Sequence, residues 1–142
     1  ELSDSLSEIA EKINGSDLIY LPGGDTKILV ERVKNAKVDN LLRKYDRIII
    51  GNSAGALALC KECVLTRRPG VRPETTIISG FGLVDFSVDA HYDPSKDREL
   101  KRLSKKRRIY AIPEKGALVC DNGKLSFIGN VRLFRQGEKT KC

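Results

Sequence analysis

The chain has no methionine, no tryptophan and a single histidine, His91. One histidine cannot provide the repeated nitrogen ligands of most zinc sites, and it leaves a serine–histidine mechanism with one candidate base. Long apolar runs are also missing, and none approaches the ~20 residues of a membrane span. The sequence therefore indicates a globular protein, and its composition gives no indication of a zinc site or a membrane span.

Cysteine is scarce as well. The chain has four cysteines, at Cys60, Cys63, Cys120 and Cys142. The first two form a C-x-x-C pair, but a zinc site would need a second pair or histidines at ligand spacing. We therefore expect ordinary thiols in a reducing cytoplasm.

The length of 142 residues predicts one domain over residues 1–142. The net charge is +7, and residues 93–115 carry nine basic and four acidic side chains. Such a cluster suits either RNA or another polyanion, or the solvated end of a helix. No aromatic side chains interleave to stack on bases, which favours the helix end and disfavours a nucleic-acid partner. A basic polyanion-binding module remains the alternative.

Hydrophobic periodicity predicts a helix over residues 3–14, in which Ser5 and Glu8 have the spacing of a capping box. Residues 17–21 and 47–50 are short apolar runs, and we expect the second to be a strand buried on both faces. Helical spacing follows each of these runs.

The second half of the chain continues the alternation of strands and helices. Strands are expected at residues 86–90 and 108–112, with an irregular segment over 64–78 before them. The pair Asn122-Gly123 indicates a hairpin. The pattern as a whole predicts an α/β fold with a mainly parallel sheet flanked by helices and a short C-terminal antiparallel β region.

The most informative stretch is residues 48–56, with the sequence IIIGNSAGA. It reads as a buried strand, the pattern G-x-S-x-G and then a helix, which is the context of a nucleophile elbow. In such an elbow Ser53 sits on a strained turn with its hydroxyl exposed, and the N–H of Ala54 faces the developing oxyanion. A plain glycine-rich strand–helix turn is the alternative reading.

A serine nucleophile needs a base and an acid to orient it. His91 follows a predicted strand, and strand ends are where α/β sites are built. Among the acids between the serine and the histidine, Glu74 lies in the irregular loop and is favoured as the triad acid. Glu62 is expected to face solvent, and Asp89 to shape the substrate pocket.

A second oxyanion donor should come from another loop at the same sheet edge. Residues 21–25, with the sequence LPGGD, fit this role because glycines let backbone N–H groups approach a substrate closely. Neither G-x-G-x-x-G nor G-x-x-x-x-G-K-[ST] is present, so a phosphate-binding loop is not indicated.

Five segments together resemble the peptidase E and cyanophycinase family of serine peptidases, which has the class I glutamine-amidotransferase-like fold. In chain order they are YLPGGDT (20–26), IGNSAGA (50–56), FSVDAHY (86–92), RELKRL (98–103) and AIPEKGAL (111–118). The resemblance implies Ser53 as nucleophile and His91 as base, with an oxyanion hole from the backbone of Gly24 and Ala54.

The resemblance also implies a small acidic substrate, such as an aspartyl peptide, and no cofactor. Arg98, and after it Arg102, are the candidates to hold the substrate carboxylate by bidentate contacts. Family members carry a further N-terminal β/α portion, and the chain begins at Glu1. We therefore expect an N-terminally incomplete domain whose sheet is completed by a second chain or a second copy. A catalytically inactive member of the same fold is the other alternative.

Overall fold

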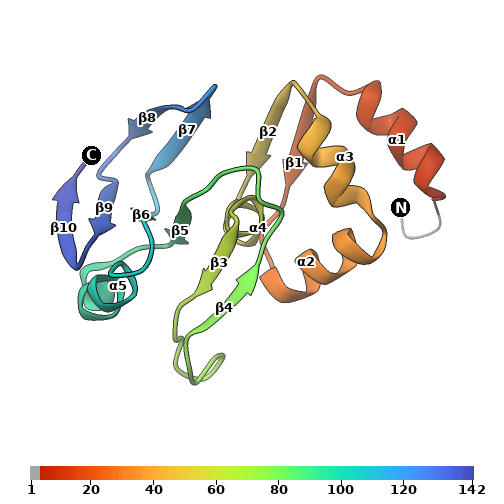
Figure 1. Ribbon diagram of the computed structural model, residues 1–142. Helices are drawn as coiled ribbons and strands as arrows, with labels where there is room; N and C mark the ends of the chain where they lie inside the picture. Colours follow the sequence, from red (N-terminus) through yellow and green to blue (C-terminus); the bar gives the residue numbers. More distant parts are fainter. Residues whose placement is uncertain (1–3) are drawn as a thin grey trace. The chain divides into compact units, whose positions relative to one another are not determined.

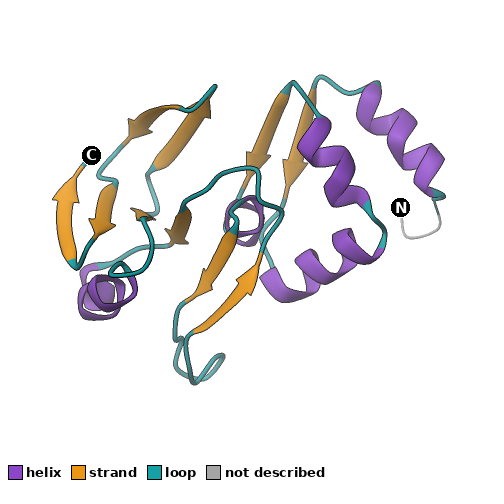
Figure 2. Ribbon diagram, in the orientation of Figure 1, coloured by secondary structure: helices purple, strands orange, loops and turns teal. Residues whose placement is uncertain are grey.

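The computed structural model describes residues 4–142, which form two compact units (Figure 1). The first unit comprises residues 4–63 and Ile78–Asp85, and the second comprises Val64–Ile77 and Phe86–Cys142. Helices dominate the first unit and strands the second (Figure 2). This division into two compact units does not test the prediction of a single domain over residues 1–142, which stays a prediction.

The first unit alternates helices with two strands. Its elements are α1 (Leu6–Asn14), β1 (Leu18–Leu21), α2 (Thr26–Asn35), α3 (Val38–Lys44), β2 (Ile48–Gly51) and α4 (Ala54–Leu59). Two further strands, β3 (Glu62–Leu65) and β4 (Thr76–Ser79), pair with each other and carry the chain from one unit to the other. These two strands occupy part of the segment 64–78, which the sequence had indicated as irregular.

The second unit contains the remaining strands and one α-helix. Its elements are β5 (Ser87–Ala90), the 3-10 helix η1 (Pro94–Lys96), α5 (Asp97–Leu103), β6 (Ile109–Ile112), β7 (Ala117–Asp121), β8 (Lys124–Ile128), β9 (Arg132–Arg135) and β10 (Glu138–Lys141). Its largest sheet has the order β10-β9-β6-β5, in which only the β5–β6 pair is parallel.

The predicted mainly parallel sheet is therefore not present as one sheet. The strands form four small sheets, with parallel pairs at β1–β2 and β5–β6 and antiparallel pairs at β6–β9, β9–β10 and β7–β8. The expected C-terminal antiparallel region is present and larger than predicted, because β9 and β10 extend the sheet that β5 and β6 begin.

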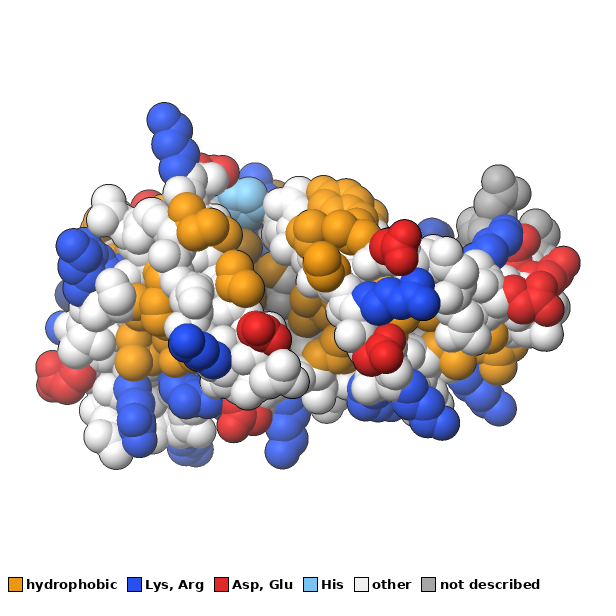
Figure 3. Space-filling view, turned by 90° about the horizontal axis from the view of Figure 1, so that it is seen from above, with side chains coloured by type: hydrophobic (Ala, Val, Ile, Leu, Met, Phe, Trp, Pro, Cys, Tyr) orange, Lys and Arg blue, Asp and Glu red, His pale blue; other side chains and the backbone are white. Residues whose placement is uncertain are grey.

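The β1–β2 pair has one covered face and one open face. Ile48 and Ile50 are 59% and 45% exposed, and their partners Leu18 and Tyr20 are exposed as well. Figure 3 shows large hydrophobic side chains at the surface. The expectation that residues 47–50 are buried on both faces is wrong, because α4 packs against this pair and no described element of the same unit covers the opposite face.

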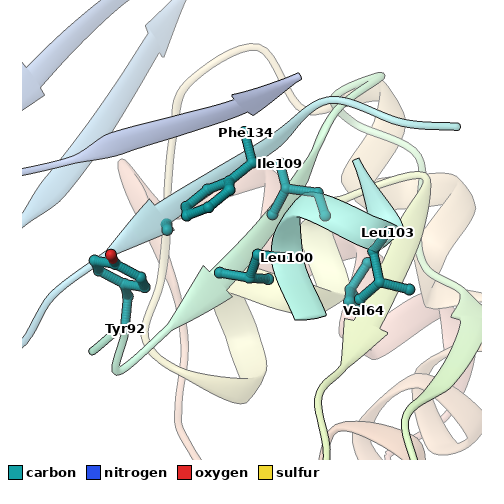
Figure 4. Close-up of a cluster of buried hydrophobic side chains, with 7 residues drawn as sticks. Val64, Tyr92, Leu100, Leu103, Ile109 and Phe134 are labelled. Carbon is teal, nitrogen blue, oxygen red and sulfur yellow. The ribbon is translucent and has the colours of Figure 1, made fainter. Parts of the chain in front are cut away.

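The core of the second unit lies between α5 and its sheet (Figure 4). Leu100, Ile109 and Phe134 are completely buried there. Full burial of a large apolar side chain stabilises the fold by about 1.5–3 kcal/mol. The remaining members of this cluster are Val64, Tyr92, Leu103 and Ala111.

Local signals in the sequence correspond to observed structure. The predicted first helix begins at Leu6, after a capping box between Ser5 and Glu8, and residue 3 lies outside the described residues. Asn122 and Gly123 have φ angles of 47° and 80° and connect β7 to β8. The hairpin is thus confirmed, with the left-handed backbone that an Asn-Gly turn favours.

The C-x-x-C pair is buried, and all four cysteines are free thiols. The Sγ atom of Cys63 donates a hydrogen bond to the Leu57 carbonyl, and burial raises the pKa of this thiol to about 11. Cys63 is therefore a packing residue and not a reactive thiolate, and Cys60 is buried as well. Among residues 4–142, no helix has the length and apolar character needed to cross a membrane.

Candidate active site

Ser53 occupies a strained turn between the end of β2 and the start of α4. Its backbone has φ 50° and ψ −108°, a combination that residues with a side chain rarely adopt. Strain of this kind costs about 1–3 kcal/mol and tends to occur at functional positions. The conformation and the strand–turn–helix context are those of a nucleophile elbow, as the sequence predicted.

Glycine is required on both sides of Ser53 because backbone segments approach too closely for a side chain. A Cβ atom at Gly55 would lie 2.2 Å from the Leu21 carbonyl oxygen. At Gly51 it would lie 2.7 Å from the Ala56 nitrogen. The two glycines of G-x-S-x-G thus let α4 pack directly against the strands that carry the serine.

The loop after β1 lies beside Ser53. The Asn52 N–H donates to the Leu21 carbonyl at 2.9 Å, and the Gly55 N–H donates to the Pro22 carbonyl at 3.1 Å. A Cβ atom at Gly23 would stand 3.4 Å from the Ser53 Cβ atom. The glycine-rich loop and the elbow are therefore held together within one unit.

This arrangement brings two backbone N–H groups to the region of the serine. Gly24 has a φ of 134°, which favours glycine, and Asp25 then caps α2 by accepting from the Ile28 N–H at 2.9 Å. Ala54 is the first residue of α4, where backbone N–H groups lack helical partners. Within residues 4–142, no backbone carbonyl accepts from the N–H of Gly24 or Ala54. Both remain suited to an oxyanion.

His91 belongs to the second unit and pairs there with Glu114. The His91 Nδ1 atom lies 2.6 Å from the Glu114 Oε1 atom. Their side chains are 55% and 76% exposed. The imidazole is the donor in this contact when Nδ1 carries the proton, and Nε2 is then the acceptor nitrogen of the ring.

Glu74 as the triad acid stays a prediction, and the carboxylate that contacts the His91 imidazole is that of Glu114. Among residues 4–142, no hydrogen bond or ion pair joins Glu74 to His91. The acid was sought only between the serine and the histidine in the sequence. The signal that could have found it is the neighbouring parallel strand: Ala90 of β5 is in register with Ile112 of β6, and Glu114 follows two residues later.

Asp89 does not have the exposed position expected of a residue that shapes a substrate pocket. Its side chain is 3% exposed and accepts hydrogen bonds from Lys96 at 3.0 and 3.1 Å and from Thr66 at 3.2 Å. Burial raises the pKa of Asp89, while Lys96 and Thr66 lower it, and the net direction is upward. We therefore assign Asp89 to the interior support of the histidine turn.

The other predicted residues are at the surface. Arg98 and Arg102 lie on α5 and are exposed, while Glu62 on β3 is half-buried and not open to solvent as expected. No cluster of three or more metal-ligating side chains occurs in the described part of the chain.

Comparison with known proteins gives a consistent result. Residues 1–128 match Peptidase family S51. The chain is similar to the uncharacterized peptidase Lmo0363 of Listeria monocytogenes, with 27% identity over 82% of this chain and 62% of that protein. It is also similar to the uncharacterized peptidase YgaJ of Bacillus subtilis, with 33% identity over 65% of this chain and 40% of that protein.

A solved structure supports the same relationship at the level of the fold. It belongs to a Listeria monocytogenes protein assigned to peptidase E, with a TM-score of 0.71 and 25% identity over 89% of this chain and 66% of that chain. This chain thus spans less than two thirds of the length of each of these relatives. Because the match extends over residues 1–128, the chain belongs to peptidase family S51, and the resemblance to peptidase E is confirmed.

Proposed function

We propose that the chain carries the catalytic residues of a serine peptidase that hydrolyses small acidic peptides. The observation that carries this proposal is the backbone of Ser53, strained at φ 50° and ψ −108° between a strand and a helix. Residues held in rarely populated backbone conformations cluster at active sites, which supports a catalytic role for this turn. Membership of a peptidase family adds support.

In the proposed reaction, the Ser53 hydroxyl attacks the scissile carbonyl, and His91 accepts its proton through Nε2. The N–H groups of Gly24 and Ala54 stabilise the oxyanion. His91 then donates the proton to the leaving amine, which leaves an acyl group on Ser53. Water activated by His91 hydrolyses the acyl-enzyme, and Glu114 orients the imidazole in both steps.

The proposed substrate is an aspartyl dipeptide or a similar small acidic peptide. The support is the exposed pair Arg98 and Arg102 on α5, since guanidinium groups bind carboxylates by bidentate hydrogen bonds. We also propose a cytoplasmic location, to which the four free thiols are suited.

A serine-reactive fluorophosphonate, with mass spectrometry to locate the label, tests the proposal. We expect labelling at Ser53 in the native chain and none in Ser53→Ala. His91→Gln should lower the labelling rate by roughly 10²-fold or more, because the base is lost. Absence of a label on folded native chain would favour an inactive member of the fold.

A substrate series tests the specificity. Arg98→Ala should weaken hydrolysis of acidic dipeptides and leave neutral dipeptides unchanged, and an equal loss for both would refute the proposed role. The polyanion-binding alternative predicts RNA binding with a steep salt dependence, lost when residues 105–108 are neutralised.

A further inference from the structure

Lys96 reaches back into the turn that carries His91. The Lys96 Nζ atom lies 3.2 Å from the carbonyl oxygens of both Ala90 and His91. The Ala90 carbonyl belongs to the peptide unit before His91, and the His91 carbonyl belongs to the peptide unit after it. The ammonium group thus holds the backbone on both sides of the imidazole.

The turn needs such a support because His91 has a left-handed backbone, with a φ of 55°. Residues with a Cβ atom disfavour this conformation, and it persists only where the surroundings fix it. The Tyr92 N–H donates to the Ile112 carbonyl at 3.0 Å, which ties the following residue to β6. Lys96 supplies the corresponding support on the carbonyl side.

Lys96 is itself fixed from the interior. Both carboxylate oxygens of Asp89 accept from its Nζ atom, and Asp89 also accepts from Thr66. An ammonium group has three N–H donors, and the four oxygen atoms within reach share them. The result is a network that begins in the buried part of the unit and ends at the backbone of the base.

Packing alone does not fix the His91 side chain. The imidazole is 55% exposed and the Glu114 side chain 76% exposed, so their 2.6 Å contact depends on where the two backbones place them. A small rotation of the His91 turn would separate Nδ1 from the carboxylate. An error of about 1 Å in the position of a catalytic group can cost about 10²-fold in rate.

We infer that Lys96 is a positioning residue for His91, acting through the Ala90 and His91 carbonyls and anchored by Asp89. This inference rests on the proposed role of His91 as the general base. Lys96 does not touch the reacting atoms in this role, and it supplies no proton to the reaction.

The test compares Asp89→Asn with the double variant Asp89→Asn/Lys96→Met. Both variants remove the buried carboxylate, and the double variant leaves no buried ammonium or carboxylate unpaired, which protects folding. They differ only in whether the two carbonyls keep their ammonium donor. Lys96→Arg, which keeps a cation and its donors, serves as the conservative rescue, and Lys101→Met on the exposed face of α5 is the control.

The readout is the tautomer of His91, measured from its two imidazole ¹⁵N chemical shifts above the imidazole pKa. The chain has one histidine, so the signal needs no assignment. We expect the Nδ1–H tautomer in the native chain, Asp89→Asn, Lys96→Arg and Lys101→Met. The double variant should shift toward the Nε2–H tautomer that a free histidine side chain favours, and fluorophosphonate labelling of Ser53 should slow by about 10- to 100-fold.

The inference is overturned if the double variant keeps the Nδ1–H tautomer and the labelling rate of Asp89→Asn. It is also overturned if Asp89→Asn alone loses both, because the amide oxygen of asparagine can still accept from the Lys96 Nζ atom, so that the two carbonyls keep their donor in this variant. Failure of the proposed function looks different. The native chain would then stay unlabelled, while the tautomer comparison would still report whether Lys96 orients His91.

Discussion

The Nδ1 atom of His91 and the Oε1 atom of Glu114 lie 2.6 Å apart although 22 residues separate them in the sequence. The parallel pairing of β5 with β6 accounts for this proximity, because Ala90 stands opposite Ile112 and both side chains follow the carboxyl ends of their strands. The sheet edge thus brings the imidazole and the carboxylate together.

Replacing Glu114 by glutamine should impair the base without disturbing the fold. Glutamine keeps the size of the side chain but can donate to Nδ1 and so favour the wrong tautomer of His91. We expect kcat/KM for an aspartyl dipeptide to fall by roughly 10²- to 10⁴-fold, with the thermal midpoint nearly unchanged. Steady-state kinetics and a melting curve check this.

Glu74→Gln provides the matched comparison for that variant. The Glu74 side chain is exposed, and no described contact joins it to His91, so its kinetics should stay within about twofold of the native chain. If Glu74→Gln lost activity and Glu114→Gln did not, the assignment of the acid would be reversed.

Gly55→Ala should destabilise the chain markedly. The new Cβ atom would meet the Leu21 carbonyl oxygen at 2.2 Å, and this oxygen belongs to the backbone, so β1 or α4 would have to move. We expect a loss of about 2–3 kcal/mol in the free energy of unfolding, measured with urea. Gly15→Ala is the control.

Gly15 lies at the end of α1 with an ordinary helical φ of −82°, and a Cβ atom there would be 3.3 Å from the Glu11 carbonyl oxygen. The free energy of unfolding should change by less than about 1 kcal/mol. Similar losses in the two variants would mean that the close approach at Gly55 does not limit stability.

Ser53→Gly should be more stable than Ser53→Ala. Glycine adopts a φ of 50° without the steric cost that a Cβ atom imposes, so the difference should be roughly 1 kcal/mol in favour of glycine. The reverse order is expected at Ala56 in α4, where Ala56→Gly should lose about 1 kcal/mol. Chemical denaturation of the three variants and the native chain measures both differences. An equal stability of the glycine and alanine variants at position 53 would argue against strain there.

Asp97 should contribute a pH-dependent part of the stability. Burial raises the pKa of this carboxyl, but hydrogen bonds from Lys139 and Tyr92, both 2.7 Å long, outweigh it and lower the pKa below its ordinary value. A depressed pKa means that the stabilisation is present above the unfolded pKa of about 3.9 and is lost as the pH falls through the folded pKa.

Asp97→Asn is therefore expected to lower the free energy of unfolding by about 1–2 kcal/mol at pH 7. The difference from the native chain should begin to shrink below about pH 4, where the unfolded carboxyl takes up its proton, and should shrink further as the pH falls through the lowered pKa of the native carboxyl. Unfolding curves at pH 7 and pH 3 measure both values. A difference that stayed constant over this range would show that the carboxylate charge is not responsible.

Local features of this chain could be predicted from its sequence because each has a local cause. The capping box at Ser5, the Asn122 turn and the strand–turn–helix around Ser53 depend on a few neighbouring residues. The predicted nucleophile and base also followed from short patterns. These signals do not contain the pairing of distant strands, which depends on the whole fold.

The expectations that differ from the structure concern features that depend on contacts between distant parts of the chain. Glu114 could be found only by knowing that β6 lies beside β5, and the buried state of Asp89 depends on Lys96 and Thr66, which come from other elements. The continuous apolar run 47–50 predicts burial on both faces of the strand. Periodicity cannot tell whether a neighbouring layer covers the second face.

The contrast among the four thiols makes the chain suitable for spectroscopy at chosen positions. Cys120 and Cys142 are exposed, whereas Cys60 and Cys63 are buried, and the raised pKa of Cys63 keeps its thiolate scarce. A maleimide dye or spin label should therefore modify the two exposed positions without engineering. With Cys142 replaced by serine and a second dye attached through a phosphonate at Ser53, energy transfer would follow the distance from Ser53 to the β7–β8 hairpin in solution.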